Sequence, residues 1–212
     1  MFFKYVKANL IPLIIEILFI VSYYIFPKDD FIYVNAFFYV LLFVYFLISK
    51  DLNLKEWFLS FRSGKKYWIQ VLLTFLGFML AFILTTILEG IFPGLETGTI
   101  NLRRDTWLTL GVFAISTILF PAITEETFYR KNLILFDSKK TVIITTILSM
   151  FLYACEHSLA PWGIFLTMIW ALPLSLSYIK TRNIYVVMTA HFLGNLLGNG
   201  SDVIATLIHW LS

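Results

Sequence analysis

The sequence predicts an all-α protein, a multi-pass integral membrane helical bundle of about seven or eight transmembrane helices. Of its 212 residues 59% are hydrophobic and only 14% are charged, and the mean hydropathy is +0.84, well above that of a soluble domain. Apolar runs of roughly 17 to 25 residues recur along the chain, which suits a hydrocarbon core that about 20 helical residues cross. These runs lack two-residue alternation, so they favour helices over a closed barrel.

The predicted helices follow one another through short connections and form a single membrane domain over residues 1–212. Their ranges are Val6–Phe26, Phe31–Ile48, Tyr67–Leu88, Trp107–Asp137, Thr141–His157, Trp162–Ile179, Ile184–Asn199 and a short Val203–Leu211. Between the second and third helices, Lys50–Lys66 mixes Leu, Trp and Phe with basic residues, which is typical of a helix lying in the membrane interface.

The distribution of lysine and arginine predicts the orientation. Alternate connections hold most of these residues, namely Lys4, Lys7, Lys50, Lys55, Arg62, Lys65, Lys66, Lys131, Lys139, Lys140, Lys180 and Arg182. The other connections hold Lys28, Arg103 and Arg104, with the acidic residues Asp29, Asp30, Glu89, Glu96 and Asp105. By the positive-inside rule we expect a cell-membrane protein with a cytosolic N-terminus. The net charge of +3 is too scattered to indicate a nucleic-acid partner.

Ionisable residues within the apolar helices mark the candidate site. A charge at mid-bilayer costs at least about 2.5 to 3.5 kcal/mol, so such residues usually face a cavity and have a function. They fall into three clusters: Glu125, Glu126 and Arg130; Glu156 and His157; His191 and Asn195.

Spacing suggests how the members of each cluster act. Glu126 and Arg130 are four residues apart, on one helix face, and can form an ion pair. Glu125 then has no cationic partner of its own, so its carboxylate suits the role of a base that takes up a proton and later returns it. His191 and Asn195 are also four apart and can direct two donors at one point, as an oxyanion requires.

The helix that carries Glu125 also contains Pro121. Proline removes one helix hydrogen bond, which leaves the carbonyl of Thr117 without its usual donor and predicts a kink beside the site. Counted from the turn Asp137–Lys140, Glu125 lies roughly 18 Å and His157 roughly 24 Å along their helices, so the clusters reach overlapping depths.

Two of the clusters reproduce motifs of a known family. Glu125, Glu126 and Arg130 read as EExxxR, and His191 and Asn195 read as HxxxN, which resembles the CAAX protease and bacteriocin-processing family, also called CPBP or Abi. Its enzymes include those that remove the last three residues of prenylated CAAX proteins, and its bacterial members are associated with bacteriocin maturation and self-immunity.

The third motif of the family, FxxxH, matches in part, with Tyr153 where Phe is usual and His157 at its end. The motifs occur in the family's order and span about a third of the chain. The resemblance thus divides the chain into N-terminal helices at 1–105, a CPBP-like catalytic core at 106–199 and a short C-terminal helix at 200–212.

The resemblance implies a hydrolase, an intramembrane endopeptidase of glutamate type or dependent on a metal. The implied catalytic residues are Glu125, Glu126, Arg130, His157, His191 and Asn195. Among them Glu125 is the general base, His157 positions the water, and Glu126 with Arg130 braces the site. The remaining two stabilise the tetrahedral intermediate.

Members of this family have also been described as metalloproteases. A set of Glu, His and His could bind zinc as a catalytic site with three protein ligands does. A site without metal ligands or cofactor is favoured, because the sequence has no HExxH and one carboxylate has a cationic partner. Zinc stays the alternative.

Other functions stay open. The chain could be a non-catalytic membrane protein that gives bacteriocin immunity by binding a peptide, or a proton-coupled transporter with Glu125 in a relay. Glu126 with Arg130 could be a structural ion pair, and His191 with Asn195 could join helices by hydrogen bonds. The expected partners are a peptide or protein substrate and membrane lipid, in a cleft open toward the cytosol. The oligomeric state is open.

Overall fold

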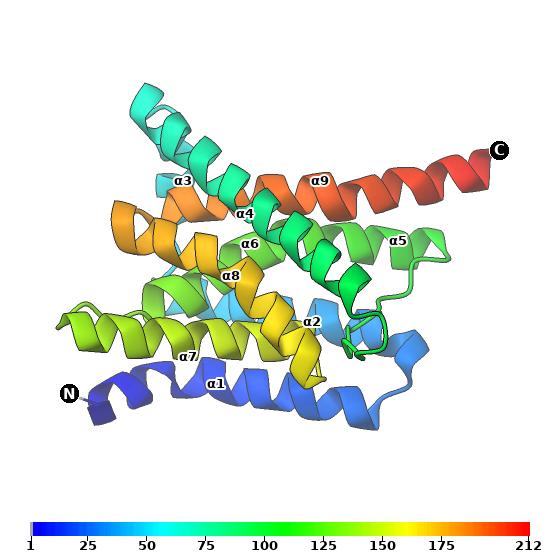
Figure 1. Cartoon of the computed structure of the whole chain (residues 1–212), viewed down its shortest axis with the longest axis horizontal. Helices are drawn as coiled ribbons and strands as arrows, with labels where there is room; N and C mark the ends of the chain where they lie inside the picture. Colours follow the sequence, from blue (N-terminus) through cyan, green and yellow to red (C-terminus); the bar gives the residue numbers. More distant parts are fainter. Residues whose placement is uncertain (1) are drawn as a thin grey trace.

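The computed structural model describes residues 2–212, and their side chains from Asn9 onward. The expectations placed on Lys4 and Lys7 therefore lie outside the described side chains. Over the described residues the chain is a bundle of helices with no β-strand beyond one isolated bridge, which confirms the predicted fold class (Figure 1).

The helices are α1 (Phe2–Ile25), α2 (Phe31–Ile48), α3 (Leu54–Ser60), α4 (Lys65–Ile91), α5 (Trp107–Ala114), α6 (Phe120–Glu125), α7 (Lys139–His157), α8 (Pro161–Thr181) and α9 (Ile184–Leu211). By length and hydropathy, four stretches of the described chain can each cross a membrane: Lys28–Ile48, Lys65–Ile91, Trp107–Asn132 and Pro161–Thr181. The outward faces of these helices are apolar, with Leu80, Ile83 and Leu108 among the exposed residues, as contact with lipid requires.

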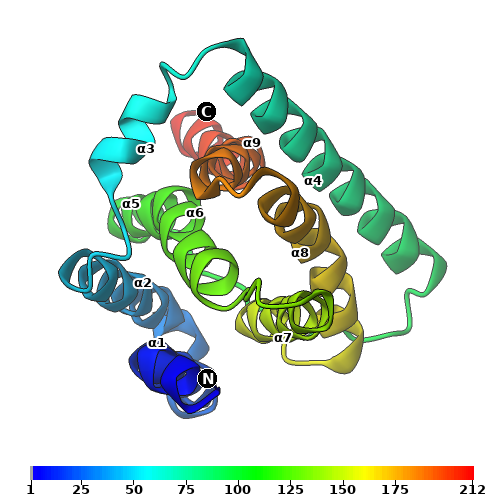
Figure 2. The ribbon, with the colours of Figure 1, turned by 90° about the vertical axis from the view of Figure 1, so that its left-hand side faces the viewer.

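Helix α6 lies near the middle of the bundle, between α2 and α9 (Figure 2). Helices α1 and α2 pack side by side along one edge, and α4 packs on α8 and α9 along the opposite edge. The residues near the centre of the sequence therefore also lie near the centre of the fold, where they are shielded from lipid.

The bundle has two ends (Figure 1). One end carries the connections at residues 49–64, 133–138 and 182–183, and we call it the basic end because most of the lysine and arginine residues lie there. The other end carries the connections at residues 26–30, 92–106 and 158–160, and we call it the far end.

The central helix is irregular around Pro121. The π-helical segment η2 (Ile115–Leu119) precedes α6, and a second one, η3 (Glu126–Asn132), follows it. Proline provides no N–H for the carbonyl of Thr117, and the side-chain amide of Asn199 on α9 donates to that carbonyl instead, at 3.0 Å. Wider π turns are common where a helix departs from its regular ladder at a functional site. The helix is thus irregular beside the site, as π-helical segments on both sides of α6, and the predicted kink stays a prediction.

Two predicted elements differ from the structure. Helix α9 runs unbroken from Ile184 to Leu211, so the predicted gap between Asn199 and Val203 is wrong. The Gly and Asn residues there suggested a break, but Gly200 is buried against the neighbouring helix and glycine is common in membrane helices. The stretch Lys50–Lys66, predicted as one interfacial helix, contains the seven-residue α3 and the start of α4. Trp57 of α3 is 4% exposed and donates to Thr189, so this side chain packs on the bundle.

The α4–α5 connection folds back onto the start of α8. Thr99 forms an antiparallel bridge with Ser158, and the N–H of Leu159 donates to the carbonyl of Gly98 at 3.0 Å. Gly98 has φ of 60°, and a Cβ there would lie 2.5 Å from the backbone nitrogen of Ala160. Glycine is therefore required for this close approach, which places an extended segment beside the end of α7.

Candidate active site

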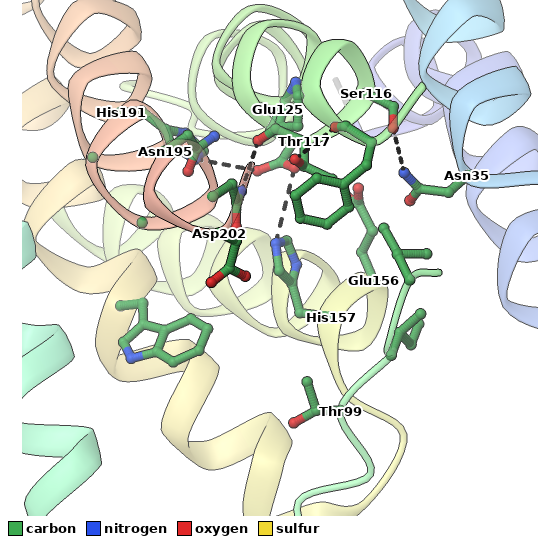
Figure 3. Close-up of a pocket in the computed structure, with 18 of the residues that line it drawn as sticks. Asn35, Thr99, Ser116, Thr117, Glu125, Glu156, His157, His191, Asn195 and Asp202 are labelled. Atoms are coloured by element: carbon green, nitrogen blue, oxygen red, sulfur yellow. Dashed lines mark hydrogen bonds and ion pairs between the residues drawn. The ribbon is translucent and has the colours of Figure 1, made fainter. Parts of the chain in front are cut away.

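Glu125 is the centre of the site. It lies at the end of α6, is fully buried, and accepts a hydrogen bond of 2.6 Å from the hydroxyl of Tyr39 on α2. Two histidines approach it from other helices, with Nε2 of His157 4.0 Å from Oε1 and Nε2 of His191 3.9 Å from Oε2 (Figure 3). Both separations are too long for a direct hydrogen bond. A water at about 2.8 Å from each atom spans such a gap, so the carboxylate can share water molecules with either ring.

His157 ends α7, and the backbone determines which ring nitrogen faces Glu125. Its Nδ1 lies 2.9 Å from the carbonyl of Tyr153, one turn earlier in the helix. A carbonyl only accepts, so Nδ1 carries the proton and the neutral ring presents the lone pair of Nε2 to the site. His157 can therefore accept a hydrogen bond from a water that also contacts Glu125.

Glu126 and Arg130 lie behind this surface. Nε of Arg130 is 3.3 Å from Oε2 of Glu126, and both side chains are 0% exposed. The guanidinium carbon also lies 4.5 Å from the ring centre of Tyr153. The other oxygen of Glu126 is 2.7 Å from Nδ1 of His191, so this carboxylate joins Arg130 to His191 and fixes the direction of the imidazole ring.

Asn195 lies one turn beyond His191 on α9. The two side chains face the same cavity as Glu125 and His157 (Figure 3). Of the six predicted catalytic residues, these four line the cavity, whereas Glu126 and Arg130 lie behind it, against the lining residues His191 and Tyr153. The three sequence clusters thus meet at one place in the fold.

Sequence reasoning missed Tyr39 and gave no role to Glu156. The hydroxyl of Tyr39 bonds to both Glu125 and Glu156, and Tyr129 donates to the second oxygen of Glu156 at 2.7 Å. Glu156 was visible as a charge inside an apolar helix. Tyr39 gave no such signal, because a tyrosine in an aromatic-rich helix is indistinguishable from an ordinary packing residue until the fold brings α2 against α6.

The donors around Glu125 do not form a ready metal site. Two ligands of a tetrahedral zinc ion, each about 2.0 to 2.1 Å from it, are about 3.4 Å apart. The two histidine nitrogens lie 4.0 and 3.9 Å from the carboxylate oxygens, and one histidine already pairs with Glu126. Among the described residues no group of three His, Cys, Asp or Glu side chains has metal-binding geometry.

A cavity of about 700 Å³ lies in front of these residues. Polar side chains that line it include Asn35, Tyr39, Thr99, Asn101, Arg104, Ser116, Thr117, Glu125, Glu156, His157, Ser158, His191, Asn195, Asn199, Ser201 and Asp202. The cavity reaches the α4–α5 connection at the far end of the bundle. The expected cytosolic N-terminus and the expected cleft toward the cytosol do not agree with each other, because the cavity reaches the far end whereas α1 begins at the basic end (Figure 1).

The fold and the site define a helical membrane protein with a buried glutamate and histidine centre. Residues 106–197 match the family described as type II CAAX prenyl endopeptidase Rce1-like. The matched segment holds all six predicted catalytic residues and confirms the resemblance of this chain to the CAAX protease family. This is a family of peptidases, so the match supports an intramembrane endopeptidase at the level of the family. No match was found among curated proteins or solved structures.

Proposed function

We propose that the chain is an intramembrane endopeptidase that cleaves a peptide or protein with a water activated by Glu125 and His157. The observation that carries the proposal is the gap of 4.0 Å between Oε1 of Glu125 and Nε2 of His157, a distance that one bridging water can span. A carboxylate acceptor and an imidazole lone pair then contact the same water molecule from different helices.

The reaction follows from these positions. The water oxygen bonds to the carbonyl carbon of the substrate while Glu125 takes a proton from the water. The carbonyl oxygen becomes an oxyanion, to which the side-chain amide of Asn195 on α9 can donate. His191 can donate through Nε2 as well when its ring is protonated at both nitrogens, because Nδ1 faces the Glu126 carboxylate. When the C–N bond breaks, Glu125 gives its proton to the departing amine, which leaves a carboxyl group on one product and an amino group on the other.

Glu126 and Arg130 support the reaction indirectly. His191 has one nitrogen against Glu126 at 2.7 Å, so its other nitrogen is directed at Glu125 and the cavity. Arg130 supplies the positive charge that the buried Glu126 carboxylate needs. The pair therefore acts as a positioning element behind the reacting groups.

The test is mass spectrometry of peptides and protein termini from cells that express the wild type, Glu125→Gln or His157→Ala at matched levels. Glu89→Gln is the matched control, because Glu89 is exposed near the end of α4 and the substitution is chemically the same. We expect termini that occur with the wild type and the control but not with the two site variants. Such termini identify the substrate as well as the reaction.

Identical termini in all four strains would contradict the proposal. If a protective phenotype then persisted in Glu125→Gln, the cavity would serve peptide binding, as in the non-catalytic immunity alternative. The size and polarity of the cavity also suit peptide binding. The fold is therefore compatible with both functions, and the effect of Glu125→Gln distinguishes between them.

A further inference from the structure

We propose that the cavity takes up an extended peptide segment, with its water, from the non-cytosolic side of the membrane. This inference rests on the proposed function for its substrate, whereas the direction of access rests on the described fold alone. Three structural features and the distribution of charge carry it.

The first feature is the position of the cavity along the helices. On α2, which begins at the far end, the lining residues are Asn35 and Tyr39, in its first half. On α4, which ends at the far end, they are Phe78, Met79 and Phe82, in its second half. On α7 and α8 the lining residues Tyr153, His157 and Trp170 also lie in the half nearest the far end. On α6 and α9 the lining begins near the middle of the bundle, at Glu125 and His191, and on α9 it continues outward to Asp202. The cavity therefore extends from the middle of the bundle to the far end.

The second feature is the dense packing toward the basic end. The first turns of α9 are buried on all sides: the exposed fractions of Val186, Val187, Met188, Thr189 and Ala190 are 0%, 0%, 1%, 4% and 0%. Trp57 from α3 packs at this end too, with its indole bonded to Thr189. The described residues that line the cavity include none from α3 and none from the first turns of α9.

The third feature is a polar stripe on α9 that leads outward from the site. His191, Asn195, Asn199 and Asp202 recur at helical spacing and all line the cavity. At the outer limit of the stripe Asp202 lies 3.2 Å from Arg104 of the α4–α5 connection, in a half-exposed ion pair. Polar residues in a membrane helix are tolerated where they face water, so this stripe marks the route by which water reaches Glu125.

The charge distribution then gives the direction. Connections at the basic end carry Lys50, Lys55, Arg62, Lys65, Lys66, Lys131, Lys139, Lys140, Lys180 and Arg182. At the far end the basic residues are Lys28, Arg103 and Arg104. Lysine and arginine accumulate on the cytosolic side of membrane proteins, so the basic end is cytosolic and the far end is not.

An extended backbone at the cavity suits a peptide. The segment around Thr99 pairs on one edge with the residues after α7, since Ile100 donates to the carbonyl of His157 at 3.2 Å. Peptide groups alternate along an extended chain, so those of Thr99 and Asn101 point to the opposite edge. A substrate strand can add to that edge by main-chain hydrogen bonds, next to the histidine that contacts the water.

Cysteine labelling tests the direction of access. Cys155 is the only cysteine, so Cys155→Ala provides a background for single cysteines. Ser201→Cys places an exposed thiol in the cavity lining, next to Asp202, and Ser63→Cys places a matched exposed thiol at the basic end. With a membrane-impermeant maleimide we expect Ser201→Cys to react in intact cells and Ser63→Cys to react only after permeabilisation. The reverse pattern overturns the proposal.

Use of the cavity as the entrance is tested on the same two variants. In isolated membranes, cleavage by each variant is compared before and after reaction with a bulky maleimide. We expect cleavage to be lost when the thiol at position 201 is modified and kept when the thiol at position 63 is modified. Continued cleavage after modification at 201 overturns the entrance. If no terminus depends on Glu125, the proposed protease fails, whereas the labelling pattern still decides the side of access.

Discussion

The hydroxyl of Tyr39 lies 2.6 Å from Oε1 of Glu125. The same hydroxyl also bonds to Glu156, so one phenol joins two buried carboxyl groups from different helices. A phenol has a single proton and can donate to only one of them. The second contact is a hydrogen bond only when one of the two carboxyl groups carries a proton and donates it to the phenol oxygen. This contact therefore indicates a proton on Glu125 or on Glu156.

Tyr39→Phe is expected to slow cleavage without unfolding the protein. The substitution keeps the ring and removes the donor to Glu125, and a hydrogen bond to a charged group contributes about 1.5 to 3 kcal/mol. If that contribution applies in the transition state, the rate falls roughly 10- to 150-fold. Tyr33→Phe is the control, because Tyr33 lies on the same helix and is 42% exposed. Equal rates in both variants would show that Tyr39 is a packing residue only.

Glu156→Gln is expected to keep most of the activity, in contrast to Glu125→Gln. Glutamine has the shape of a protonated glutamic acid, and its amide can donate to Tyr39 while its oxygen accepts from Tyr129. A general base cannot be replaced in this way, so the same chemical change at position 125 abolishes cleavage. The measurement is the initial rate for both variants at matched expression. Loss of activity in Glu156→Gln would assign Glu156 a charged role in the reaction.

The motifs predicted the three clusters because a charge within lipid is conspicuous in a sequence. Glu126 and Arg130 could even be paired in advance, since a spacing of four residues fixes their common helix face. Which carboxylate contacts His191 could not be predicted, because that depends on how α9 is rotated against η3. The structure resolves it through the contact of 2.7 Å between His191 and Glu126.

Tertiary packing also explains what the sequence could not show about the fold. The Gly and Asn residues near Gly200 are typical of a loop, yet α9 continues there, with Gly200 buried near Ile118 and Asn199 bonded to Thr117. At the far end, the α4–α5 connection folds against Ser158 through an isolated bridge and lines the cavity. Neither Thr99 nor Gly98 belongs to a recognisable motif, so this contact had no local signal.

Chelators are expected to leave cleavage unchanged. The carboxylate and imidazole atoms are 4.0 and 3.9 Å apart and Glu126 already engages one ring, so the described residues do not enclose a zinc ion at about 2.0 to 2.1 Å. The check is the cleavage rate after dialysis against a zinc chelator, with and without added zinc. If activity is lost on dialysis and restored by added zinc, this would contradict a mechanism in which Glu125 and His157 activate the water without a metal.

Arg130→Met is expected to destabilise the protein strongly. It removes the cation beside Glu126 in a fully buried pair, and breaking such a pair costs about 3 to 5 kcal/mol because the other charge stays buried. The double variant Glu126→Gln with Arg130→Met removes both charges and should be more stable than Arg130→Met alone. The readout is the thermal unfolding temperature in detergent. A double variant no more stable than the single one would show that Arg130 acts mainly through its packing on Tyr153.

The contact between Asn199 and the carbonyl of Thr117 predicts a coupling with Pro121. Proline leaves that carbonyl without a helix donor, and the Asn199 amide supplies one at 3.0 Å. Asn199→Ala alone should therefore lower stability by about 1 to 2 kcal/mol. In a Pro121→Ala background the N–H of residue 121 can donate to Thr117, so the carbonyl keeps a partner and Asn199→Ala should have a smaller effect. The measurement is the thermal unfolding temperature of the four proteins in this cycle. Additive effects would show that Asn199 does not replace the missing helix bond. Coupling would mean that α9 supplies the hydrogen bond that Pro121 removes from the central helix. The polar stripe of α9 would then stabilise that helix as well as line the cavity.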